Sequence, residues 1–281
     1  MLVAQQYLSP FDKLIGVIGD AGSGKSMLIK GMFPGLELTN DDEGVNIRPL
    51  PLLSVGEDEG GFYTAHTYHA DIRFEAAFTQ MHELADCIME AVGMGKRVIV
   101  EHFDLIYPFL PRNADLLIGI GEEVFITRPT LFGPVPEDVA EVAYRTQPVR
   151  RMAHTAEDLC EFVIAEMGIP QHYAHADVRH GFILSFTEKP DIDLDYLENR
   201  VNSMIEKDMP ISFKDETHIQ IGNHLHLCTG PRMHVKSTGE LNKLSLINEL
   251  LQDPHSGEYL MVGIVGNRDI REMSELNRLV Q

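Results

Sequence analysis

A short glycine-rich segment, residues 19–26, has the residue types and spacing to bind phosphate. It fits the pattern G-x-x-x-x-G-K-[ST] at every fixed position. Glycines let successive backbone N–H groups turn toward a phosphate, and a helix that starts there adds its positive end. We expect Lys25 to reach the β- and γ-phosphates and act in catalysis, and the Ser26 hydroxyl to bind Mg²⁺. The residues expected to contact the nucleotide are Gly19, Asp20, Ala21, Gly22, Ser23, Gly24, Lys25, Ser26 and Met27.

The flanks of this segment match its expected setting. Leu14–Ile18 predicts a short buried strand and residues 27–30 continue into a helix, which argues against a glycine-rich turn without a ligand. Arg97–Glu101 is a compact apolar strand that ends in an acid. A carboxylate at the carboxyl end of a buried strand is well placed to hold Mg²⁺ through water or to activate a hydroxyl. Glu101 is therefore a catalytic candidate, and Asp104 competes for the role.

A second group of chemistry-bearing residues begins with a helical pair. Nine of the thirteen histidines lie beyond residue 150. A helix is expected to begin near Arg150, and on it His154 and Asp158, four residues apart, project together from one face. Side chains at positions i and i+4 are a common way to present two metal ligands.

Residues 218–228 alternate as one strand should. We expect the apolar residues Ile219, Ile221, Leu225 and Leu227 on one face and His224, His226 and Cys228 on the other. A turn at residues 229–231 then leads to His234. Imidazoles and a thiolate are ligands that zinc favours. The alternative is a polar cleft lined by histidines without a metal.

Composition limits the classes of partner. The formal net charge is −20, with 43 acids against 23 Lys and Arg, and the nearest basic cluster is residues 145–151 with three arginines. Because phosphate backbones are bound by clustered basic residues, we expect no DNA partner. The apolar runs are too short for a membrane span, and the first ten residues lack a signal-peptide pattern. Three widely spaced cysteines argue against a disulfide framework and favour the reducing cytoplasm.

The chain is long enough for two domains, expected at residues 1–147 and 148–281 with a linker at 146–149. The first alternates strand and helix signals and predicts a parallel α/β sheet. Its clearest helix is residues 74–92, and Leu116–Ile120 and Val124–Thr127 are expected to complete the sheet, while residues 45–55 predict an edge strand or loop. Residues 270–279 predict a terminal amphipathic helix.

The phosphate segment, the strand ending at Glu101 and residues 114–118 together resemble the uridine kinase group of P-loop kinases. The resemblance implies an α/β P-loop NTPase domain, a parallel sheet with flanking helices, whose matching strand ends in a functional Glu. No acceptor-binding motif or arginine-rich lid is evident. Asp58 and residues 61–63 are the candidates for a position near an acceptor.

Residues 150–270 resemble the second additional domain, the editing domain, of alanyl- and threonyl-tRNA synthetases and of free-standing alanyl-tRNA editing proteins. The matching segments, in order, are residues 151–156, a strand at 179–186, a helix at 194–209, and 227–241 with its Cys, His-Val and Thr-Gly-Glu. The resemblance implies an α+β domain with a metal, here zinc, held by His154, Asp158, Cys228 and His234. Asp158 replaces a histidine of the family, and the Cys-to-His spacing is longer by two. His224 or His226 is therefore an alternative ligand to His234.

Three functions follow as hypotheses. The first is an ATP- or GTP-using kinase or NTPase whose second domain binds a small amino-acid-like ligand. The second is an editing hydrolase of aminoacyl-tRNA, of the Ala, Ser or Thr type, regulated by nucleotide. The third is a non-enzymatic nucleotide-dependent sensor. The intact phosphate segment favours the first, whereas the charge of −20 and the altered ligand set disfavour the second.

Overall fold

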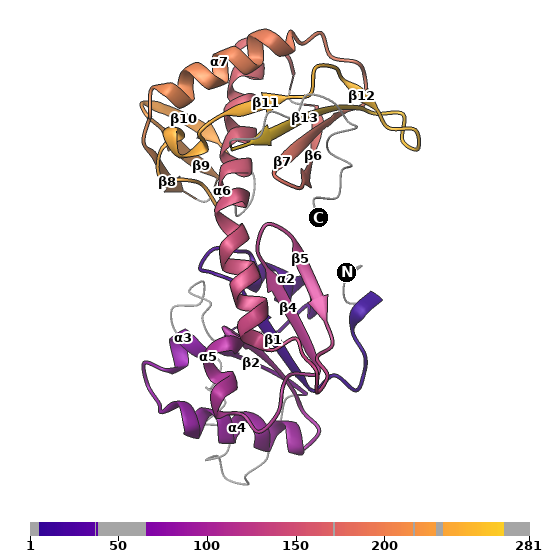
Figure 1. Cartoon of the computed structure of the whole chain (residues 1–281), viewed down its shortest axis with the longest axis vertical. Helices are drawn as coiled ribbons and strands as arrows, with labels where there is room; N and C mark the ends of the chain where they lie inside the picture. The colour runs from indigo at the N-terminus through magenta and orange to yellow at the C-terminus, as the bar shows by residue number, and fades with distance from the viewer. Residues whose placement is uncertain are drawn as a thin grey trace. The chain divides into compact units, whose positions relative to one another are not determined.

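The computed structural model describes residues 6–36, 38, 66–170, 172–215, 217–228 and 233–266. The chain folds as two compact units, Met1–Arg145 and Thr146–Gln281 (Figure 1). The expected features at residues 45–55, 58, 61–63, 229–231 and 270–279 lie outside the described residues. Within the described part of the chain, no helix combines the length and the apolar character needed to cross a membrane.

The first unit is built on a five-stranded mixed sheet in the order β2-β3-β1-β4-β5. The strands are β1 (Leu14–Ile18), β2 (Thr67–Asp71), β3 (Arg97–Glu101), β4 (Leu116–Ile120) and β5 (Val124–Thr127). The first four run parallel, and β5 is antiparallel to β4, beside which it lies in Figure 1. The prediction of a fully parallel sheet was therefore wrong for β5. The three residues between β4 and β5 are too few for the crossover that a parallel pair requires.

Helices of the first unit pack on both faces of this sheet. Strand β1 alternates: Ile15 and Val17 pack with Ile29 of α2 (Lys25–Met32), whereas Leu14 and Ile18 pack with the buried face of α4 (Met81–Gly93). Short helices α3 (Ile72–Glu75) and α5 (Phe103–Ile106) follow the ends of β2 and β3, and a 3-10 turn, η2 (Tyr107–Phe109), follows α5. The middle strand β1 is thus buried on both faces and positions the phosphate segment that follows it.

The expected single helix at residues 74–92 is two helices, α3 and α4. Asp71 caps α3 by accepting hydrogen bonds from the backbone N–H groups of Arg73 and Phe74. A new start is set for α4 by Glu83, whose carboxylate accepts from the backbone N–H of Gln80. The prediction of one helix relied on an apolar pattern that includes Phe78, which lies between α3 and α4 and is 72% exposed. Local capping therefore outweighed periodicity here, although the expected end at residue 92 is within one residue of the observed end at Gly93.

The expected linker at residues 146–149 is helical, and so is the sequence on either side. Helix α6 runs from Pro136 to Glu166 and includes Pro148. A proline inside a long helix removes one backbone hydrogen bond, which the remaining turns can sustain. The helix expected near Arg150 therefore begins fourteen residues earlier, at Pro136.

The second unit packs α6 and α7 (Leu194–Glu206) with two antiparallel sheets. One sheet has the order β11-β13-β7-β6, with β12 also paired to β13, and the other has the order β10-β9-β8. Its remaining elements are β6 (Tyr173–Val178), β7 (Gly181–Phe186), β8 (Ile211–Asp215), β9 (His218–Ile221), β10 (His224–Leu227), η3 (Thr238–Leu241), β11 (Leu244–Leu246), β12 (Leu251–Gln252) and β13 (Tyr259–Val265). Its core joins Leu159 and Val163 of α6, Val201 of α7 and Phe182 of β7. Antiparallel sheets with helices agree with the expected α+β class.

The expected single strand at residues 218–228 is a hairpin of β9 and β10. Register pairs Ile219 with His226 and Ile221 with His224, so these side chains share a face. Leu225 and Leu227 lie on the opposite face and are 55% and 45% exposed. The predicted alternation treats residues 218–228 as one strand and ignores Gly222-Asn223, a pair typical of hairpin turns. The predicted faces were therefore wrong.

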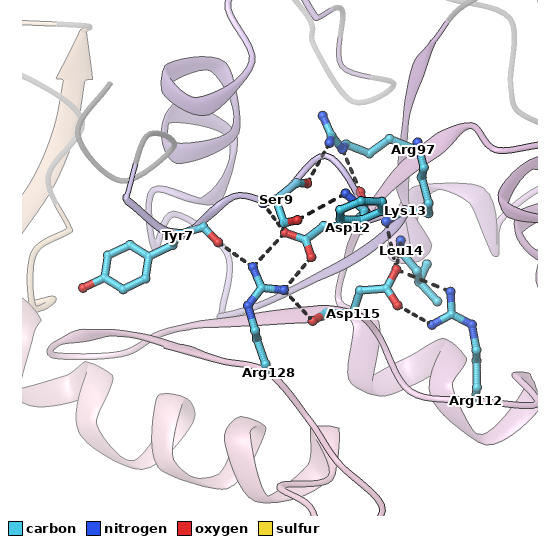
Figure 2. Close-up of polar contacts among 10 residues, drawn as sticks. Tyr7, Ser9, Asp12, Lys13, Leu14, Arg97, Arg112, Asp115 and Arg128 are labelled. Atoms are coloured by element: carbon cyan, nitrogen blue, oxygen red, sulfur yellow. Dashed lines mark hydrogen bonds and ion pairs between the residues drawn. The ribbon is translucent and has the colours of Figure 1, made fainter.

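A polar network joins segments that flank the amino ends of the parallel strands (Figure 2). The Asp115 carboxylate, just before β4, accepts hydrogen bonds from the backbone N–H groups of Lys13 and Leu14 at 2.8 and 2.9 Å. Arg97 at the start of β3 donates to the carbonyl of Asp12 over 2.8 Å. Arg128, just after β5, donates to the Asp12 carboxylate over 2.9 Å. These contacts hold together the amino ends of the strands, at the end of the sheet opposite the phosphate segment.

We expect replacement of Arg128 by leucine to lower the free energy of unfolding by about 1–3 kcal/mol at neutral pH, since the buried Asp12 carboxylate loses its guanidinium partner. Burial by itself raises the pKa of Asp12, but hydrogen bonds from Arg128 and Ser9 and the charge of Arg128 lower it overall. A carboxyl whose pKa is lower in the folded state stabilises the folded protein at pH values above its unfolded-state pKa. That stability is lost as the pH falls through the folded-state pKa. The difference between the two proteins should therefore shrink as pH falls through and below the ordinary Asp pKa of about 3.9.

Urea unfolding at several pH values measures this difference. The control is Arg145→Leu, which removes an exposed arginine 3.8 Å from Glu141 on α6 and should change stability by less than about 0.5 kcal/mol. A stability loss for Arg128→Leu that stays constant across pH would contradict the role given to Asp12.

Candidate functional site

The phosphate segment leaves the middle strand β1 and turns directly into α2. Gly24 caps this helix with φ of 92°, a left-handed conformation that favours glycine. A Cβ on Gly19 would lie 2.6 Å from Ser23 Oγ and 3.0 Å from the carbonyl of Ile120. Two of the pattern's glycines are thus required by the local backbone, whether or not a ligand is bound.

Lys25, Ser26 and Glu101 meet at the carboxyl end of the sheet. Strands β1 and β3 pair in parallel with Val17 opposite Glu101, which brings the acid beside the segment that follows β1. Lys25 Nζ lies 3.7 Å from Glu101 Oε2, and Ser26 Oγ donates to Glu101 Oε1 over 3.2 Å. Lys25 and Glu101 are buried, and Lys25 Nζ also donates to the carbonyl of Asp20 over 2.9 Å.

A second strand delivers more ligands to the same place. Asp71 ends β2 in register with Glu101, and Asp71, Glu101 and His102 each offer a ligand atom within 4.8 Å of the others. His69 Nε2 lies 3.2 Å from Glu101 Oε1. His102 has a left-handed φ of 57°, and among the described residues its buried Nδ1 has no hydrogen-bond partner. This group has the geometry to hold a cation.

Burial and charge set the protonation of the group. Burial lowers the pKa of Lys25, while the carboxylates of Glu101 and Asp71 oppose that change. Burial alone raises the pKa of Glu101, but the hydrogen bond and charge of His69, the charge of Lys25 and the hydrogen bond from Ser26 lower it overall. Burial and the charges of Lys25 and Arg73 lower the pKa of His102 to about 4, so this imidazole is neutral at pH 7. The site thus pairs an ionised carboxylate with a neutral histidine.

Asp104, the competing acid, lies apart from this group. It is on α5 and accepts a hydrogen bond from Tyr144 over 3.3 Å. Burial raises the pKa of Asp104, in contrast to the lowered pKa of Glu101. Of the other residues expected to touch a nucleotide, Asp20 lies 3.6 Å from Arg73, and Met27 is 56% exposed on α2.

In the second unit, three of the four expected metal ligands come together. His234 Nε2 lies 2.6 Å from Asp158 Oδ2 and 3.7 Å from Cys228 Sγ. Asp158 and Cys228 are buried, and the three residues form a group whose ligand atoms lie within 4.8 Å of one another. This set of carboxylate, thiol and imidazole can bind zinc.

His154 belongs to none of the ligand groups among the described residues. Its Nε2 lies 3.6 Å from Asp177 on β6, so the side chain that precedes Asp158 by four residues takes a different partner. Of the two alternative ligands, His226 lies 4.0 Å from Asp158 and groups with Asp158 and Glu161. His224 is exposed on the hairpin with its ring centroid 5.3 Å from that of Phe162, and it joins no such group.

Several residues at both sites were missed from the sequence. Asp71 carries a readable signal, since residues 67–71 form a strand that ends in an acid, as residues 97–101 do. Glu157 and Glu161 have the same i, i+4 spacing as the predicted pair His154 and Asp158. His69 and His175 have no comparable local signal, because their partners Glu101 and Glu157 lie far away in the chain. His102 directly follows Glu101, but its other partner, Asp71, lies on a different strand.

No protein-family model matches the chain, and a comparison with curated proteins finds no similar sequence.

Proposed function

We propose that the first unit binds a nucleoside triphosphate with Mg²⁺ and cleaves or transfers its γ-phosphate, as a kinase or an NTPase. The observation that carries the proposal is the convergence of Lys25, Ser26 and Glu101, at 3.7 and 3.2 Å, beside a glycine loop that starts a helix. A cation, a hydroxyl and a carboxylate in this setting are the groups that phosphoryl transfer uses. The proposal includes the P-loop NTPase fold that the resemblance to the uridine kinase group implies.

Each residue has a distinct task in this proposal. The start of α2 and Lys25 bind the phosphates, and Ser26 binds Mg²⁺, which would neutralise charge on the transferring phosphoryl group. Asp71 and Glu101 supply carboxylates for the waters around the ion. Glu101, kept ionised by its neighbours, also orients the attacking water or hydroxyl.

A second candidate function rests on the group Asp158, Cys228 and His234 in the other unit. Zinc bound there could organise a pocket for an aminoacyl ester or a small amino-acid-like ligand, as the resemblance to synthetase editing domains implies. A nucleotide-dependent sensor without turnover is the third candidate. Cys87, Cys160 and Cys228 form no disulfide among the described residues, which supports a cytoplasmic location.

One pair of assays separates these candidates. Purified chain is incubated with Mg²⁺-ATP or Mg²⁺-GTP and release of inorganic phosphate is measured, and it is incubated separately with Ala-tRNA or Ser-tRNA and loss of the aminoacyl group is measured. We expect phosphate release that depends on Mg²⁺ and on Lys25. Aminoacyl loss without phosphate release would favour the editing hydrolase over the kinase or NTPase. Nucleotide binding with neither reaction would exclude the NTPase and the editing hydrolase, and would be consistent with the sensor or with a kinase without its acceptor.

A further inference from the structure

Three groups of metal-ligating side chains overlap along one face of helix α6. In each group, one ligand atom per residue lies within 4.8 Å of the others. The groups are Asp158 with Cys228 and His234, Asp158 with Glu161 and His226, and Glu157 with Glu161 and His175. The first two share Asp158, and the last two share Glu161. The ligands therefore extend beyond the single set that the synthetase resemblance implies.

The two oxygens of Asp158 face different imidazoles. Oδ2 lies 2.6 Å from His234 Nε2, on the side of Cys228, and Oδ1 lies 4.0 Å from His226 Nε2, on the side of Glu161. Asp158 is 1% exposed and sits among the buried residues of the unit. A buried carboxylate that presents one oxygen to each of two ligand sets has the arrangement of a bridging ligand.

We infer that the second unit holds two neighbouring divalent metal ions, with Asp158 as the bridging carboxylate. The first ion is bound by Asp158, Cys228 and His234, and the second by Asp158, Glu161 and His226. Two ions in adjacent sites that share a carboxylate are a recurrent arrangement in hydrolytic proteins. This inference does not depend on the nucleotide site.

The ligand chemistry differs between the two positions. Thiolate with imidazole is a soft set that favours zinc. Two carboxylates with one imidazole form a harder set, which suits Zn²⁺ or Mn²⁺. His175 supports the second position from outside, since its Nδ1 lies 2.7 Å from Glu157 Oε1 and 3.1 Å from Glu161 Oε1. Partners of this kind orient a ligating carboxylate.

Charge gives an independent reason for cations here. Glu157, Asp158 and Glu161 lie within five residues of α6, and their exposures are 2%, 1% and 6%. A divalent ion bound among these buried carboxylates would supply positive charge and coordination together.

The test counts metal ions on the full chain. Protein is freed of metal with a chelator and then equilibrated with Zn²⁺ or Co²⁺, and the bound metal is measured. We expect wild type to bind two more ions than Asp158→Asn. An ion held by the first unit would be counted equally in both proteins and does not affect this difference. Glu161→Gln should bind one fewer than wild type while keeping the thiolate-to-cobalt absorption of Cys228. The control is Glu166→Gln on the same helix, an acid outside the groups that pairs with Arg200, which should match wild type.

Two results would overturn the inference. One is a wild type that exceeds Asp158→Asn by one ion or none. The other is a Glu161→Gln protein that folds cooperatively, by circular dichroism on heating, and binds as many ions as wild type. If Glu161→Gln does not fold, His226→Asn removes a ligand of the same ion, and we expect it to lose one ion and keep the cobalt–thiolate absorption.

Discussion

Replacing Lys25 with alanine should weaken binding of Mg²⁺-ATP or Mg²⁺-GTP about 10- to 100-fold. A charge-assisted hydrogen bond to phosphate contributes about 1.5–3 kcal/mol, and each 1.4 kcal/mol is tenfold in the dissociation constant. Lys25 is the first residue of α2 and is buried with Nζ 3.7 Å from Glu101, so the replacement removes a positive charge at the loop itself. Isothermal titration calorimetry on both proteins measures the change.

Lys30→Ala is the matched control for this result. It removes the same side chain from the same helix, but Lys30 is exposed on the last turn of α2. We expect its dissociation constant to stay within about twofold of wild type. Equal losses for Lys25→Ala and Lys30→Ala would indicate a general effect of net charge, and an unchanged Lys25→Ala would remove Lys25 from the site.

Replacing Glu101 with glutamine should lower the rate of phosphate release by about 100- to 10,000-fold, the contribution typical of a positioned acid–base group. The change keeps the size of the side chain and removes the negative charge that Ser26, His69 and Lys25 contact. Because the phosphates are bound mainly by the loop and Lys25, nucleotide affinity should change by less than about tenfold. Phosphate release and calorimetry on the same preparation separate the two effects.

Asp104→Asn decides between the two acids that the sequence left in competition. Asp104 contacts Tyr144 and lies outside the group of Asp71, Glu101 and His102, so its replacement should leave the rate within about threefold of wild type. A large loss in Asp104→Asn together with a small loss in Glu101→Gln would reverse the assignment of the catalytic acid.

Four short strands of the first unit were predictable from the sequence. Residues 14–18, 97–101, 116–120 and 124–127 are strands with the expected bounds, because short apolar runs with clear ends leave few alternatives. The carboxyl ends of β1 and β3 lie together because the strands are parallel neighbours, which places Ser26 beside Glu101. Strands predicted from local signals therefore account for a contact between two residues that are 75 positions apart in the sequence.

Features that depend on pairing between distant segments were not predictable in the same way. The faces of β9 and β10 follow from the hairpin at Gly222, which reverses the alternation expected for one strand. His154 lies 3.6 Å from Asp177 of β6 and joins no ligand group among the described residues, a pairing that the helix sequence does not reveal. The link between Glu161 and His226 likewise depends on how the hairpin packs on α6. Periodicity within an element predicts its faces but not which side chain meets which.

The measurement that tests the central claim most directly is the titration of wild-type protein with ATP and GTP, with and without Mg²⁺, followed by calorimetry. The proposed site predicts saturable binding of one nucleotide per chain, with an affinity that rises when Mg²⁺ is present. Absence of binding by either nucleotide at millimolar concentration, where a dissociation constant of about 1 mM corresponds to only about −4.1 kcal/mol, would contradict it.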